Sequence, residues 1–92
     1  MTTTEAAIEA KRVSQIQDSL RVTERGDLVE YFGTWRVVTM NASNPHNDGG
    51  FIRLRYISET IDLYFYNVSK VTRVVRQCNP EFTEAAKECL RQ

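Results

Sequence analysis

The side chains from which enzymes build catalytic and metal centres are scarce in this sequence. It holds one histidine, His46, and two cysteines, Cys78 and Cys89. The cysteines lie eleven residues apart in and beside a predicted helix, so roughly 15 Å separates them, which is too far for a disulfide. His46 has no second histidine and no nucleophile at a recognisable spacing. We therefore predict no enzymatic activity, no metal site, no cofactor, and two reduced thiols in a cytoplasmic protein.

Long apolar runs and an excess of one charge are missing as well. No run approaches the ~20 apolar residues that cross a bilayer, and the N-terminal segment lacks the basic start and apolar block of a secretory signal. Twelve basic side chains balance twelve acidic ones, which argues against strong nonspecific binding to duplex nucleic acid. The balance is uneven, because residues 51–76 contain five basic and two acidic side chains. We predict no membrane segment and a mildly basic middle of the chain.

The length of 92 residues fits one domain, and its patterns predict two helices and five strands. Apolar residues at helical spacing predict an N-terminal helix over residues 2–22, and Asn79 followed by Pro80 predicts the start of a C-terminal helix over 79–91. Alternating apolar residues between turn formers predict the strands, which cover residues 28–32, 35–40, 51–57, 60–66 and 71–75. Residues 41–50 are nearly all turn formers and are predicted as a loop.

Alternation within the strands separates residues of the core from residues of an outer face. Five large apolar residues are predicted to be largely buried, namely Trp35, Val37, Leu54, Leu63 and Phe65.

The outer face of the third and fourth predicted strands then carries two arginines and two tyrosines: Arg53, Arg55, Tyr64 and Tyr66. Arginine and tyrosine are typical of protein-binding hot spots, and also of platforms on which single-stranded nucleic acid stacks. The alternative is that a helix covers this face and packs on the arginine stems and tyrosine rings. In that case residues 41–50 would be the better candidate for a binding surface.

Two stretches of the sequence resemble SH3-like small barrels. Residues 26–38, which read GDLVEYFGTWRVV, resemble the opening hairpin of such barrels, and residues 67–74, which read NVSKVTRV, resemble their closing turn and last strand. A helix ahead of five strands is also similar to the Sm-like RNA-binding barrels. The resemblance implies an α+β fold, in which a small five-stranded antiparallel barrel over residues 26–76 is flanked by an N-terminal and a C-terminal helix. It also implies a domain that binds peptides, proteins or RNA.

These observations favour a non-catalytic protein-binding module, such as an adaptor, a regulatory subunit or a small inhibitor of a larger machine. A short, compact chain of this kind suits a phage or bacterial accessory protein. The alternative function is binding of RNA or single-stranded nucleic acid by an Sm-like, ring-forming barrel. Ala6, Val13 and Leu20 form a narrow seam at seven-residue spacing in the first helix, which predicts a homo-oligomer.

Overall fold

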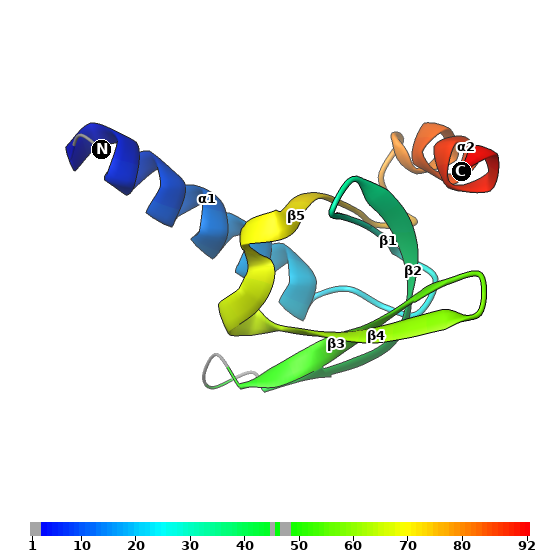
Figure 1. The fold of residues 1–92 in the computed structure, drawn as a ribbon, viewed down its shortest axis with the longest axis horizontal. Helices are drawn as coiled ribbons and strands as arrows, with labels where there is room; N and C mark the ends of the chain where they lie inside the picture. Colours follow the sequence, from blue (N-terminus) through cyan, green and yellow to red (C-terminus); the bar gives the residue numbers. More distant parts are fainter. Residues whose placement is uncertain (1–2, 45, 47–48) are drawn as a thin grey trace.

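The predicted α+β class is confirmed, with one helix on each side of the strands in the sequence. The computed structural model describes residues 3–44, 46 and 49–92, and Figure 1 shows their arrangement. The elements in chain order are α1 (Thr3–Arg21), β1 (Leu28–Tyr31), β2 (Thr34–Ser43), β3 (Gly50–Tyr56), β4 (Glu59–Tyr64), the 3-10 helix η1 (Phe65–Lys70), β5 (Val71–Val75) and α2 (Phe82–Arg91).

The five strands form one antiparallel sheet in the order β4-β3-β2-β1-β5. The register shifts between Val38 and Met40 in β2 and between Glu30 and Tyr31 in β1, and such bulges bend and twist a sheet. In Figure 1 the sheet is strongly curved, and η1 carries the chain from β4 at one edge to β5 at the other. The strand pairings of the described residues include no ladder between β4 and β5, so closure of a barrel stays a prediction.

Two hairpin turns place a large apolar residue in the left-handed region of backbone conformation. Phe32 has a φ of 52° and is followed by Gly33 at 73°, in the turn between β1 and β2. Ile57 has a φ of 55° in the turn between β3 and β4. Left-handed geometry matches the twist of two-residue hairpin turns, which usually take asparagine or glycine because other side chains meet their own backbone there.

The main core lies between the inner face of the sheet, α1 and η1. Leu54, Leu63 and Phe65 are buried in it, as predicted, and Trp35 is buried in a second cluster beneath α2. Val37 is only half-buried, so its predicted burial was too strong. It lies at the margin of the second cluster, whose buried members are Leu28, Trp35, Val75 and Ala85.

Only the C-terminal half of α1 packs on the sheet. Ile16 and Leu20 are buried in the main core and Val13 is packed against it, whereas residues 4–11 are all exposed and project away from the strands in Figure 1. Two of the three residues of the predicted seam therefore contact the chain's own core. A homo-oligomer stays a prediction, and Ala6 is the exposed member of the seam in this arrangement.

Hydrogen bonds to a single tryptophan fix α2 on the outer side of β1 and β2. The indole Nε1 of Trp35 donates to Glu88 at 2.7 Å, and Gln92 bonds both the N–H and the carbonyl oxygen of Trp35. The guanidinium of Arg73 lies 5.0 Å from the centre of the indole ring on the same side of the sheet. The two helices thus occupy separate parts of the sheet, at opposite ends of the view in Figure 1.

Three predicted boundaries were wrong. Strand β2 runs to Ser43, into the predicted loop, because the side chain of Asn41 donates to the carbonyl oxygens of Arg21, the last residue of α1, and of Thr23 just beyond it, which holds the strand there. Strand β4 stops at Tyr64, since the chain must turn to reach the other edge of the sheet. Helix α2 begins at Phe82, after a turn in which Asn79 accepts a hydrogen bond from the N–H of Glu81.

Candidate functional site

The candidate site is the side of β2, β3 and β4 that faces away from the main core. Register places Phe51 opposite Tyr64, Arg53 opposite Asp62, and Arg55 opposite Thr60 on this side of the β3–β4 hairpin. Strand β2 adds Met40, which pairs with Arg53. We call this surface the outer face, defined by Met40, Phe51, Arg53, Arg55, Asp62 and Tyr64.

Aromatic and aliphatic side chains are exposed on the outer face. Tyr64 is 41% exposed and Met40 is 42% exposed. The rings of Phe51 and Tyr64 lie 5.8 Å apart at a tilt of 53°, and the guanidinium of Arg53 lies 5.4 Å from the centre of the Phe51 ring. The main contacts of α1 are with β5 and η1, and those of α2 are with β2 and β1. The predicted alternative, in which a helix buries this face, is thus not the arrangement found.

Arg53 is held in place by an acid on the neighbouring strand. Its Nε donates to Asp62 Oδ1 at 2.9 Å and a terminal nitrogen donates to Oδ2 at 3.4 Å. The hydrogen bond and the charge of Asp62 raise the pKa of Arg53 above its usual value. Asp62 also neutralises the charge of this arginine. Arg53 therefore contributes a flat, fixed guanidinium surface to the outer face and not an unpaired charge.

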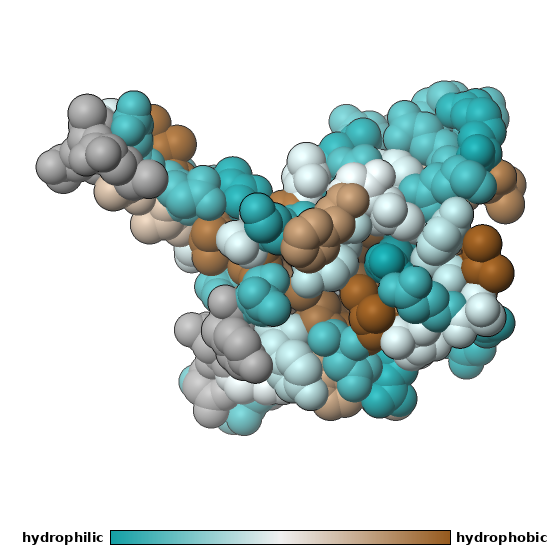
Figure 2. Space-filling view, in the orientation of Figure 1, coloured by the Kyte–Doolittle hydropathy of each residue, from teal (hydrophilic) through white to brown (hydrophobic). Residues whose placement is uncertain are grey.

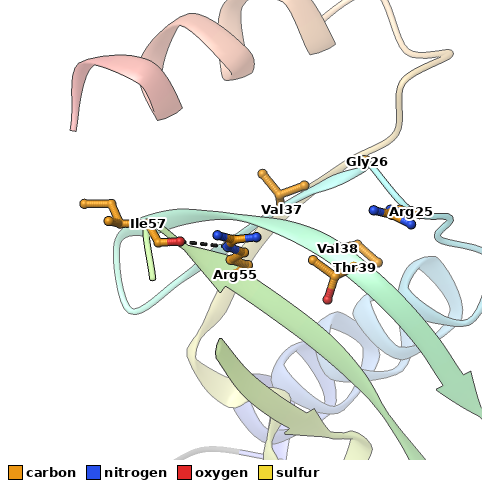
Figure 3. A pocket seen from close by; sticks show the side chains of 7 residues that line it. All are labelled: Arg25, Gly26, Val37, Val38, Thr39, Arg55 and Ile57. Carbon is orange, nitrogen blue, oxygen red and sulfur yellow. Dashed lines mark hydrogen bonds between the residues drawn. The ribbon is translucent and has the colours of Figure 1, made fainter. Parts of the chain in front are cut away.

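Arg55 has a different environment from Arg53. Its Nε donates to the carbonyl oxygen of Ile57 at 2.7 Å, and it makes no ion pair with any acid in the described part of the chain. It lines a hollow of about 360 Å³ together with Arg25, Gly26, Val37, Val38, Thr39 and Ile57. Figure 3 shows Arg55 and Ile57 at one end of this hollow and Arg25 at the other, below the ribbon of α2.

The structure brings together three of the four predicted site residues, though not as direct neighbours. Arg53 and Tyr64 are diagonal neighbours, because Tyr64 pairs with Phe51. Arg55 lies further along β3, towards the turn. The backbone of Tyr66 belongs to η1 instead of β4, and its side chain lies outside the described part of the structure.

Sequence reasoning missed two residues of the outer face, Phe51 and Met40. Phe51 was expected only as the first residue of a strand, and Met40 as the last residue of another. Phe51 could have been found from alternation, since it precedes Arg53 by two residues in the same strand. Met40 could not, because only the observed register places it opposite Arg53.

Of the other candidate groups, Cys89 lines a hollow together with Arg55, whereas His46 and Cys78 line neither that hollow nor the one beside Arg25. His46 is exposed in the loop between β2 and β3. Cys78 is exposed, and burial raises the pKa of the Cys89 thiol. Within the described ranges no three histidine, cysteine, aspartate or glutamate side chains are placed to share a metal ion. None of the described helices is long and apolar enough to cross a membrane.

Comparison of the chain with protein-family models, with curated proteins and with solved structures finds no match. The function of the outer face therefore has to be argued from its own geometry.

Proposed function

We propose that this protein is a non-catalytic binding module whose outer face docks on another protein. The observation that carries the proposal is the group formed by the exposed Tyr64 and Met40 and the half-buried Phe51 around Arg53, on a sheet surface that the two helices leave open. Aromatic residues, methionine and arginine are the residue types enriched in protein interfaces. Rigid tyrosine and ion-paired arginine side chains also lose little conformational freedom on binding.

The charges of this face favour a protein partner over nucleic acid. Single-strand platforms combine stacking rings with cations that neutralise phosphates. Here the guanidinium of Arg53 already donates two hydrogen bonds to Asp62. The carboxylate of Asp62 would in addition repel a phosphate backbone. Only Arg55 among the arginines of the face has its charge uncompensated within the described residues.

The finer fold assignment, an SH3-like barrel, belongs to the same proposal. Residues 26–38 contain β1 and the first part of β2, paired as a hairpin, and residues 67–74 contain the end of η1 and most of β5. These are the two stretches for which the resemblance implies an opening hairpin and a closing turn. The proposal also includes a regulatory or adaptor role and a cytoplasmic location.

Site-specific photo-cross-linking tests the proposal. Tyr64 is replaced by the photoreactive amino acid p-benzoylphenylalanine in the full chain, which is expressed in the cells that produce it and irradiated. The matched control carries the same amino acid in place of Lys87, which is exposed on α2 away from the outer face. We expect one protein adduct from position 64 that is missing from position 87. Adducts with nucleic acid, or equal adducts from both positions, would contradict the proposal.

A further inference from the structure

Beside the outer face, a groove runs between α2 and the end of the β3–β4 hairpin. Two hollows form it, of about 360 Å³ and about 380 Å³, and both are lined by Val37, Arg55 and Ile57. The first continues to Arg25, whereas the second continues to Leu90 near the end of α2. Each hollow has the size of a site for a few side chains. Because they share a wall, together they suit an extended segment.

The Arg25 end of the groove carries uncompensated positive charge. Arg25 and Arg55 line the same hollow, and in the described part of the chain neither makes an ion pair. A carboxylate that enters this hollow would meet a guanidinium group at each end and no acidic residue in its lining. This hollow therefore favours a carboxylate over a neutral or basic group.

The other end of the groove is apolar and faces solvent. Ile57 is 73% exposed and Leu90 is 87% exposed, and both line the second hollow. In Figure 2 brown surface gathers at the right-hand edge, over the end of the β3–β4 hairpin and the nearby end of α2. The C-terminus of a helix carries partial negative charge, so an acid is less favoured here than at Arg25.

The backbone conformation of Ile57 in its exposed position is energetically unfavourable. A β-branched residue at a φ of 55° is a strained choice for a turn where asparagine or glycine would fit without strain. The Arg55 hydrogen bond to the Ile57 carbonyl fixes the turn, which keeps the side chain beside the groove. Strain of this kind clusters at binding sites, where a particular side chain is needed in a particular place.

From this geometry we infer that the groove binds an extended peptide segment of the partner, with acidic side chains at Arg25 and Arg55 and a large apolar side chain against Ile57 and Leu90. The inference rests on the proposed function, because Arg55 belongs to both surfaces. It adds the chemistry of the partner: an acidic segment next to an aliphatic or aromatic residue.

Peptide selection tests the groove without the partner. The immobilised full chain is used to select from a phage-displayed library of random peptides of about twelve residues. The enriched peptides are then synthesised and titrated by fluorescence anisotropy. We expect aspartate or glutamate within a few positions of leucine, isoleucine or phenylalanine. Arg25→Ala and Leu90→Ser, both at exposed positions, should each weaken binding by about tenfold or more, the usual effect of losing an interface anchor.

Lys87→Ala is the matched control, because Lys87 is exposed on α2 three residues before Leu90 but lines neither hollow. It should change peptide affinity by less than about twofold. The inference would be overturned if no peptides are enriched or if their consensus lacks acidic residues. It would also be overturned if Arg25→Ala and Leu90→Ser leave the peptide affinity unchanged. Tight, steeply salt-dependent binding of an oligo(dT) probe that Arg25→Ala abolishes would overturn it as well, because such binding would assign the groove to nucleic acid.

The two proposals can fail separately. A protein adduct at position 64 without an acidic–apolar peptide consensus would overturn the groove inference alone. A groove-dependent consensus without an adduct at position 64 would overturn the role of the outer face alone.

Discussion

Replacing Ile57 by asparagine should make the protein more stable while weakening its groove. An L-residue other than asparagine or glycine in the left-handed region costs about 1–2 kcal/mol, and Ile57 has a φ of 55°. The substitution also removes the hydrophobic stabilisation from the buried part of the Ile57 side chain, which is 73% exposed. Because full burial of isoleucine is worth about 1.5–3 kcal/mol, the buried quarter contributes roughly 0.5 kcal/mol. The net gain of Ile57→Asn is therefore about 1 kcal/mol.

Thermal unfolding followed by circular dichroism measures this gain. For a domain of this size 1 kcal/mol shifts the midpoint by about 4–8 °C, so Ile57→Asn should melt that much higher than the wild type. The same variant should bind the selected peptides about tenfold more weakly. An unchanged or lower midpoint would refute the reasoning, because it would show that Ile57 stabilises its own chain and is not held in place for a ligand.

Three other substitutions test the core, a buried carboxylate and the outer face. Leu63→Ala should lower the free energy of unfolding measured in urea by about 2–5 kcal/mol, since Leu63 is buried in the main core. Near wild-type stability would show that Leu63 points away from the core and that the two faces of β4 are assigned the wrong way round. Burial opposes ionisation of Asp27, but hydrogen bonds from Glu24 and Gln77 outweigh it and lower the pKa of this carboxyl. Its stabilisation is therefore present above pH ~4 and is lost as the pH falls through the lowered pKa. Asp27→Asn should cost about 2 kcal/mol at pH 7 and progressively less below pH ~4, whereas a constant cost down to pH ~2.5 would contradict this. Tyr64→Ala should leave the melting midpoint within a few degrees, and a loss of cooperative unfolding would show that the ring belongs to the core.

The faces of the strands could be predicted from the sequence, but their register could not. Alternation placed Arg53, Arg55 and Tyr64 on the outer side, and Leu54 and Leu63 in the core, as the structure has them.

The predicted turn at Ser58 and Glu59 would have paired Arg53 with Tyr64. The observed turn at Ile57 and Ser58 pairs Arg53 with Asp62 instead. This shift keeps every side chain on its face, so alternation carries no signal of it. Turn propensities also do not predict isoleucine at position 57, because hairpin turns with a positive φ usually take asparagine or glycine.

The remaining errors come from contacts between distant segments. Asn41 has low strand propensity and stands in a run of turn formers, but its side-chain amide donates to the last two carbonyl oxygens of α1, some twenty residues earlier in the chain. Tyr66 continues the alternation of the fourth strand, whereas the chain turns into η1 at Phe65 to cross the core. Whether α1 and α2 cover the outer face depends on their docking, which no local pattern determines. The groove could not be predicted because it lies between α2 and a hairpin about thirty residues earlier.

The central claim, that the outer face docks on a protein, is tested most directly by the affinity of the cross-linked partner. This affinity is measured by biolayer interferometry for the wild type, Tyr64→Ala and the control Lys87→Ala, at low and high salt. We predict that Tyr64→Ala weakens binding by about 30-fold at both salt concentrations, the size expected for an aromatic hot spot, and that Lys87→Ala has no effect. A loss of less than about threefold for Tyr64→Ala, or a steep salt dependence that Arg53→Ala flattens, would contradict the account.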